Sequence, residues 1–168
     1  MRYGRWEHQW LRILRWHRRT VNATGRLTGR ASRDAEDFSE ALCHSVWHLK
    51  DWLKNDPRQT LLASRDIETF ANHDPALMTV ADLANGTKHV QLSAEGSRTE
   101  AVRMGLVHWL GEGDLDNPEG IKRVWVYVDD PDSEVDREVV DVAWDGIESW
   151  RKWLSDSGLQ VLGDPQGD

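Results

Sequence analysis

Two groups of polar side chains recur at helical spacing in the middle of the chain. The first group, at i, i+4 and i+7, is His44, His48 and Asp51. The second group, at i, i+3 and i+7, is Asp82, Asn85 and His89. At about 100° per residue, the members of each group fall within about 60° of one another on a helix. Imidazole, amide and carboxylate groups held on facing helices are what general acid–base catalysis needs. The sequence therefore predicts one cluster of His48, Asp51, Asp82, Asn85 and His89.

The same side chains allow two other interpretations. Each group flanks the apolar stripe of its helix, so both would also fit solvated helix edges. Imidazole and carboxylate ligands suit Zn, Fe or Mn, and a metal site made of His44, His48, His89 and Asp82 is an alternative to a site without a cofactor. The sequence lacks the paired Glu-x-x-His helices of the ferritin-like di-iron proteins, which counts against the metal site.

The N-terminal segment is strongly basic and the rest of the chain is acidic. Residues 1–33 contain nine arginines and one acid, Glu7, for a net charge of +8, and the remaining residues carry -16. Arginine interleaved with Trp6, Trp10 and Trp16 offers charge and stacking surface for RNA. We expect the nucleic-acid contacts to come from Arg5, Arg12, Arg15, Arg19, Arg26 and Arg30. Docking of this segment on the acidic body, or on a second subunit, is the alternative.

Hydrophobic periodicity predicts the helices that would position these groups. A first amphipathic helix is expected over about 4–21, with an apolar stripe of Trp6, Trp10, Ile13, Leu14, His17 and Val21. A flexible linker follows over 22–33, and a second helix runs from an N-cap at Asp34 to about Asn55. A short helix covers about 65–72. Asp74 and Pro75 then open a central helix that continues through Leu92.

The last third of the chain predicts a hairpin and a closing helix. Apolar residues alternate with polar ones over 101–128 around a turn region at 111–120, which indicates two antiparallel strands. A turn at 129–132 leads into a long helix from about Val135 to Leu154, with Gly158 as its C-cap. Cys43 is expected to be a small core residue.

These elements predict a mainly α protein, a single-domain bundle of about four to five helices with a small hairpin before the last helix. We divide the chain into the basic helix and linker at 1–33, the helical domain at 34–163 and a disordered tail at 164–168. No apolar run approaches the roughly 18 residues that cross a bilayer, and the N-terminus lacks the apolar region of a secretory signal. The single cysteine excludes an internal disulfide. We therefore expect a cytoplasmic protein without membrane contacts.

Two segments carry a resemblance to a known family: residues 82–89 (DLANGTKH) and, on the preceding long helix, residues 48–53 (HLKDWL). Over about 34–95 the chain resembles uncharacterised bacterial helical proteins similar to the HEPN superfamily. The nuclease motif of that superfamily is an Arg, usually followed by a polar residue, with a His four to six residues after the Arg. Asn85 and His89 match the polar residue and the His, while Ala84 stands at the position of the Arg. Lys88 or an arginine of the basic segment would supply the charge.

The resemblance implies a compact, often homodimeric bundle that acts on RNA in toxin–antitoxin modules or phage defence. The implied activity is metal-independent RNA cleavage, in which His89 acts on the ribose 2′-OH, and the implied partner is an antitoxin or another neighbour-encoded protein. A degenerate, non-catalytic relative would fit the same residues. Two further alternatives are the metal-binding bundle enzyme and a non-catalytic interaction module that binds nucleic acid or a partner through the basic segment.

Overall fold

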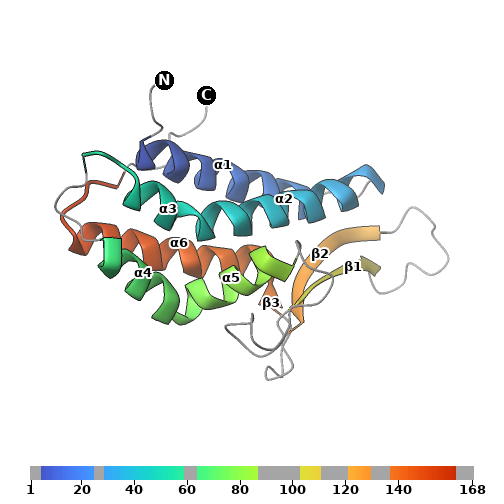
Figure 1. Ribbon diagram of the computed structural model, residues 1–168. Helices are drawn as coiled ribbons and strands as arrows, with labels where there is room; N and C mark the ends of the chain where they lie inside the picture. The colour runs from blue at the N-terminus through green and yellow to red at the C-terminus, as the bar shows by residue number, and fades with distance from the viewer. Residues whose placement is uncertain are drawn as a thin grey trace.

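Four antiparallel helical limbs form a bundle in the computed structural model, and a small sheet lies at one end of it (Figure 1). The structure describes residues 5–24, 29–58, 64–86, 103–110, 121–129 and 137–161. The limbs are α1 (Trp6–Thr24), α2 (Gly29–Trp47) with α3 (Leu49–Lys54), α4 (Ser64–His73) with α5 (Pro75–Gly86), and α6 (Val139–Asp156). The strands are β1 (Arg103–Leu110), β2 (Ile121–Asp129) and β3 (Arg137–Glu138). The predicted mainly α bundle with a hairpin before the last helix is confirmed.

Helix α1 is an integral part of the bundle. The apolar side chains of its first three turns, Trp6, Trp10, Ile13 and Leu14, are buried in the same core as α2, α5 and α6. The prediction that Val21 continues this stripe is wrong, because Val21 is 46% exposed. In its last turns α1 buries Thr20, Ala23 and Thr24 instead, so its inner face has rotated away from Val21.

The linker predicted over 22–33 is too long. Helix α1 continues to Thr24 and α2 already begins at Gly29, so the N-cap predicted at Asp34 is wrong: Asp34 lies inside α2. The hydroxyls of Thr20 and Thr24 donate to the carbonyls of Trp16 and Val21 at 3.0 and 3.1 Å, which satisfies acceptors near the end of α1. Burial of the threonines and alanine of this turn outweighs the low helix propensity that suggested a linker.

The helix predicted over 34–55 is divided at His48 into α2 and α3. The carbonyl of His48 accepts from the backbone N–H of Asp51 at 3.0 Å and, less closely, from that of Trp52 at 3.4 Å, which is the pattern of a tightened turn. His48 itself still donates its N–H to His44 at 3.0 Å, so the hydrogen-bonded chain is not interrupted. Phe38 and Trp52 pack partly buried on the core, while Leu42, Leu49 and Leu53 are fully buried as their spacing predicts.

The third limb starts as predicted. Helix α4 matches the expected short helix, and the carboxylate of Asp74 accepts the backbone N–H of Leu77 at 3.0 Å, which confirms Asp74 as the cap of α5. Helix α5 packs against α2 and α6, and Leu77, Val80, Leu83 and Ala84 are buried there. The predicted continuation through Leu92 lies outside the described residues.

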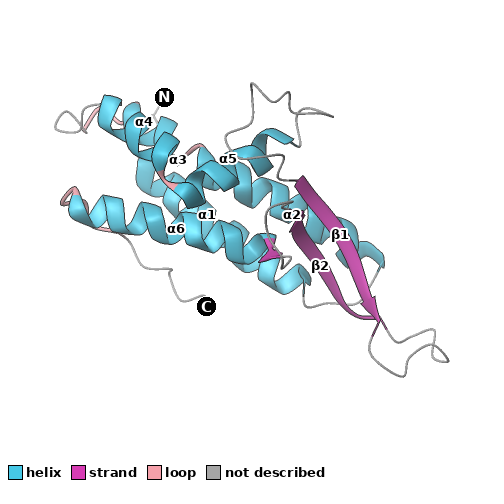
Figure 2. Cartoon of the chain, turned by 90° about the horizontal axis from the view of Figure 1, so that it is seen from below, coloured by secondary structure: helices cyan, strands magenta, loops and turns pink. Residues whose placement is uncertain are grey.

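The three strands form an antiparallel sheet in the order β1-β2-β3. Strand β2 pairs along β1, with Leu106 opposite Val126 and Met104 opposite Val128, and both valines are buried. Figure 2 shows β1 and β2 beside α2 at the end of the bundle. Strand β3 was not predicted because two residues carry no periodic signal. The turns predicted at 111–120 and 129–132 fall wholly or largely on residues that are not described.

Helix α6 closes the bundle and begins at Val139 rather than at about Val135, because Arg137 and Glu138 form β3; its end is as predicted. Gly158 has a φ of +74°, and the N–H groups of Gly158 and Leu159 donate to the carbonyls of Ser155 and Leu154, each at 2.9 Å. These bonds form a Schellman motif, for which glycine is the favoured residue. Gly146 of α6 lies where an added Cβ would come within 3.1 Å of Val80 and 3.2 Å of Val46, so it permits close approach of α6 to α5 and α2.

Among the described residues, the core contains the cysteine and four buried tryptophans, and four partly buried tryptophans pack against it. Cys43 is fully buried, and this burial raises the pKa of its thiol to about 12. The indole N–H of buried Trp150 donates to the carbonyl of Val46 at 3.1 Å, which satisfies its polar group inside the core. The prediction that Cys43 is a small core residue is confirmed. No helix in the described ranges is long and apolar enough to cross a membrane.

Candidate functional site

A basic hollow of about 530 Å³ lies between α1 and α2. It is lined by Arg12, Arg15, Trp16 and Arg19 from α1 and by Ala41, His44 and Ser45 from α2. The α1 residues are spaced at i, i+3, i+4 and i+7, so the helix presents them on one face. Because α1 and α2 pack along their lengths, the same spacing on α2 completes the opposite wall.

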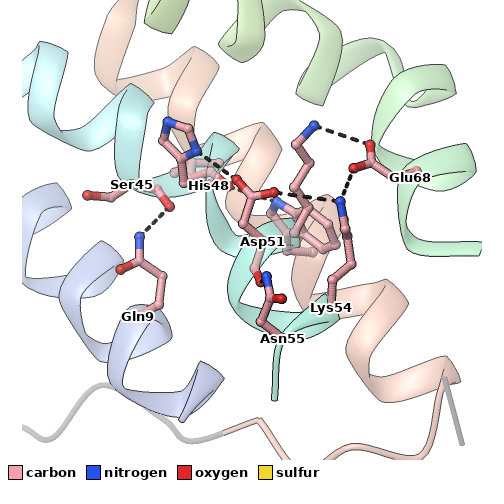
Figure 3. A network of polar contacts seen from close by, with 10 residues as sticks. Gln9, Ser45, His48, Asp51, Lys54, Asn55 and Glu68 are labelled. Atoms are coloured by element: carbon pink, nitrogen blue, oxygen red, sulfur yellow. Dashed lines mark hydrogen bonds and ion pairs between the residues drawn. The ribbon is translucent and has the colours of Figure 1, made fainter. Parts of the chain in front are cut away.

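Two of the three arginines of the hollow, Arg12 and Arg19, are positioned by an amide and by aromatic rings. The Arg12 guanidinium donates to the side-chain oxygen of Gln9 at 3.1 Å, and its carbon lies 5.5 Å from the centre of the Trp52 ring. The amide nitrogen of buried Gln9 in turn donates to the carbonyl of Ser45 at 2.8 Å (Figure 3), which joins α1 to α2. Contacts of this kind restrict a guanidinium without neutralising it.

Of the three tryptophans predicted to offer stacking surface, Trp6 and Trp10 are buried in the core, and Trp16 forms the aromatic part of the wall. Its ring centre lies 5.6 Å from that of Phe38, and the guanidinium carbon of Arg19 lies 4.8 Å from the Trp16 ring centre. Arg19 is exposed, so its guanidinium lies over the indole while its donors remain accessible to solvent. Such a stacked guanidinium is a platform for a further planar group such as a base.

Within the described residues, no carboxylate forms an ion pair with Arg12, Arg15 or Arg19. The ion pairs present there lie elsewhere: Arg58 with Asp56 and Glu7, Lys50 and Lys54 with Glu68, Arg137 with Asp145, and Arg151 with Glu148. The hollow therefore holds three positive charges that have no ion-pair partner among the described residues.

A row of polar side chains, His44, His48 and Asp51, extends from the hollow along α2 and α3. The parallel rings of His44 and His48 have centres 6.1 Å apart, and His48 Nδ1 lies 2.9 Å from a carboxylate oxygen of Asp51. Figure 3 shows His48 and Asp51 pointing toward each other. Because a carboxylate only accepts, Nδ1 donates, and Nε2 of a neutral ring is then the proton acceptor. The predicted grouping of His44, His48 and Asp51 is thus present, with both His48 and Asp51 half-exposed at 41% and 43%.

Beyond Asp51 the row ends in paired charges. Lys54 lies 3.8 Å from Asp51 and 2.5 Å from Glu68, and Lys50 lies 3.2 Å from Glu68. Hydrogen bonding from Lys54, then from Lys50, holds the pKa of Glu68 below its usual range, and the same bond to Glu68 raises the pKa of Lys54. This end of the row joins α3 to α4 and is internally neutralised.

The second predicted polar group is only partly described. Asp82 is fully buried in α5 and Asn85 is half-buried, whereas Lys88 and His89 lie outside the described residues. The prediction that His89 joins His48 in one cluster is therefore untested. The full burial of Asp82 sets it apart from the half-exposed pair of His48 and Asp51.

No group of three or more His, Cys, Asp or Glu side chains in the described ranges is arranged to hold a metal ion. His44, His48 and Asp82 of the alternative metal site therefore form no such group among themselves. His89, its fourth member, is not described.

Of the six arginines predicted to bind nucleic acid, three are brought together in the hollow. Arg5 is exposed just before α1, Arg26 is not described, and Arg30 lies in α2 with its side chain not described. Sequence reasoning did not place Ala41, His44 and Ser45 opposite these arginines. The matching three- and four-residue spacing on both helices was visible, but the packing of one helix face on the other was not.

No protein-family model matches this chain, and neither a curated protein nor a solved structure matches it.

Proposed function

We propose that this protein binds single-stranded RNA and that the basic hollow between α1 and α2 contacts its phosphate. One observation carries the proposal: three arginines line a single hollow and, within the described residues, have no carboxylate partner. Phosphate supplies the missing charge, and the guanidinium stacked on Trp16 offers a surface for a base. The acidic remainder of the chain repels phosphate, which favours binding at this one place.

Truncation is a poor test of this proposal, because α1 carries Trp6, Trp10, Ile13 and Leu14 of the core. Deleting residues 1–33 would remove the RNA-binding residues and unfold the bundle together. Substitution of an exposed arginine separates binding from folding. Arg15 is exposed and lines the hollow, so Arg15→Gln removes one charge with little effect on packing.

The test is fluorescence anisotropy of a labelled single-stranded RNA with the wild type, Arg15→Gln and the matched control Arg137→Gln. Arg137 is also exposed, but it pairs with Asp145 away from the hollow. We expect Arg15→Gln to weaken binding by about tenfold, the loss of one charge-assisted hydrogen bond, and Arg137→Gln to change it by less than about twofold. Equal affinities for all three proteins, or no RNA binding by the wild type, would refute the proposal.

RNA cleavage is a second candidate, favoured by the hydrogen bond between His48 and Asp51 beside the hollow. In such a reaction the ribose 2′-oxygen forms a bond to phosphorus as the bond to the 5′-oxygen breaks. The histidine takes the 2′ proton, and the leaving 5′-oxygen receives a proton from water or an imidazolium. The resemblance to HEPN proteins implies His89 for this role, along with a toxin or defence function, a homodimer and a neighbour-encoded antitoxin.

Two variants distinguish the histidines. RNA is incubated with each protein in the presence of a chelator, and 2′,3′-cyclic phosphate ends are measured. Loss of cleavage in His48→Ala with retained RNA binding and melting temperature would identify His48 as the base, and the same result in His89→Ala would identify His89. Absence of cyclic phosphate from the wild-type reaction would exclude this activity and leave RNA binding as the function.

A further inference from the structure

Along the helices, acidic residues of α2 and α3 come before and after the residues that form the α2 wall of the basic hollow. One helical turn before Ala41 and His44 lie Asp37 and Glu40, and past His48 in the other direction lies Asp51. Partial burial, then the charges of Glu36 and Asp37, raises the pKa of Glu40, which shows how closely these acids are gathered. Among the side chains that the structure describes, acids of α2 and α3 thus flank the residues that form the α2 wall of the hollow.

A nucleic-acid strand that continued along α2 beyond Ala41 would meet Asp37 and Glu40, and in the other direction it would meet Asp51, which is already paired with His48 and Lys54. Residues 12 to 19 of α1 span only about 10 Å of helix, and a volume of about 530 Å³ is that of a small-ligand pocket rather than of an extended channel. The short length and small volume of the hollow favour the binding of one nucleotide over the binding of several consecutive nucleotides.

The charge of the hollow selects the form of that nucleotide. An internal phosphodiester carries one negative charge, whereas a terminal phosphate monoester carries about -1.5 to -2 at pH 7. Arg12, Arg15 and Arg19 supply three positive charges without a carboxylate partner in the described part of the chain. A monoester neutralises more of this charge than a diester at the same place.

We propose that the basic hollow is a site for a strand end, a nucleotide carrying a terminal phosphate monoester, with the phosphate on Arg12 and Arg15 and the base against the guanidinium of Arg19. This inference rests on the proposed RNA binding and specifies which part of the RNA is bound. The described hollow fits a 5′-phosphate, a 3′-phosphate or a free nucleotide equally, and the experiment separates these sources.

The experiment compares the affinity of the full chain for four forms of one ten-nucleotide RNA: 5′-phosphorylated, 3′-phosphorylated, with hydroxyl at both ends, and circular. Adenosine monophosphate serves as a competitor and is also titrated alone. We expect one phosphorylated form to bind about tenfold more tightly than the hydroxyl form, and the circle to bind most weakly. Arg15→Gln should abolish this difference, and Arg137→Gln should preserve it.

The outcomes separate the two proposals. Equal binding of all four forms, still dependent on Arg15, would overturn the strand-end site while RNA binding stands. Binding of adenosine monophosphate without binding of any RNA would retain the phosphate monoester site and overturn RNA binding. Failure of every probe to bind would overturn both.

Discussion

Two regions that contain basic side chains differ in whether those side chains are paired with acids. Both regions lie along α1 and the limb formed by α2 and α3. In the basic hollow, Arg12 and Arg19 contact aromatic rings, and Arg12 also donates to an amide. No described carboxylate forms an ion pair with the arginines of the hollow. At the other end of these helices, which we call the ion-paired end, each cation faces an acid; its members are Glu7, Lys50, Lys54, Asp56, Arg58 and Glu68. The ion pairs at the ion-paired end therefore connect elements of the fold, whereas the arginines of the hollow remain available to bind a ligand.

Charge reversal in the hollow should have the largest effect. Arg15 and Arg19 are exposed, so Arg15→Glu/Arg19→Glu changes the charge by four units with little loss of packing. We expect RNA affinity to fall by at least about 100-fold, since each lost charge-assisted contact costs about 1.5–3 kcal/mol, with an unchanged melting temperature. The matched control, Arg137→Glu/Lys152→Glu, changes the net charge equally outside the hollow and should reduce affinity only a few-fold. Similar losses in both proteins would show that net charge alone attracts RNA.

Removal of a carboxylate from the ion-paired end should lower the stability of the fold and leave RNA binding nearly unchanged. The side chain of Asp56 is buried, and it accepts from Arg58 and from the backbone N–H of Trp6, the first residue of α1. Asp56→Ala leaves the Trp6 N–H without its acceptor and removes the main partner of Arg58, which keeps Glu7, so we expect the free energy of unfolding to fall by about 2–3 kcal/mol in urea denaturation. RNA binding by the folded variant should stay within about twofold of wild type. A stable Asp56→Ala protein with lost RNA binding would reverse the assignment of the two regions.

Acid should act on the ion-paired end in a defined range. Hydrogen bonds from Arg58 are the main cause that lowers the pKa of Asp56 to about 2 from an ordinary value of 3.8. A carboxyl whose pKa is lower in the folded state stabilises the fold above its unfolded pKa, and this contribution is lost as the pH falls through the folded value. We expect unfolding free energy to decline between about pH 4 and pH 2, and the decline to be shallower in Asp56→Ala. Parallel pH profiles for the two proteins would contradict this account.

The smallest effect is expected where an ion pair is exposed and remote from both regions. Arg137 and Asp145 are each 50% exposed and lie 2.7 Å apart. Solvent screens such a pair, so Asp145→Asn should change the free energy of unfolding by less than about 0.5 kcal/mol, again measured in urea. A loss as large as that of Asp56→Ala would mean that pairing, rather than burial, sets the contribution of these charges.

Periodicity and local chemistry predicted most of the fold. The stripe of Val139, Ala143, Ile147, Trp150 and Leu154, the cap at Asp74 and the left-handed Gly158 depend on neighbours within a few residues, and all are confirmed. The end of α1 was misjudged because burial of Thr20 and Thr24 is a tertiary effect that outweighs propensity.

The candidate site was predictable only one helix at a time. The shared face of Arg12, Arg15 and Arg19 follows from spacing, and so does that of His44 and His48. Which face of α2 lies opposite which face of α1 is decided by how Trp10, Leu42 and their neighbours fill the core. The two faces had therefore been interpreted as separate sites, one for nucleic acid and one for catalysis or metal.

The hydrogen bond from the Trp6 backbone N–H to Asp56 also bears on how the molecule folds. The two residues are 50 positions apart and 3.3 Å separates the bonded atoms, so the first turn of α1 is completed by a residue from the end of the second limb. Closing a loop of this length costs chain entropy, and this cost precedes the stabilisation that the hydrogen bond provides. We therefore expect the start of α1 to be secured late in folding, after the two helices have paired. Loss of Asp56 would then appear mainly as faster unfolding rather than slower folding.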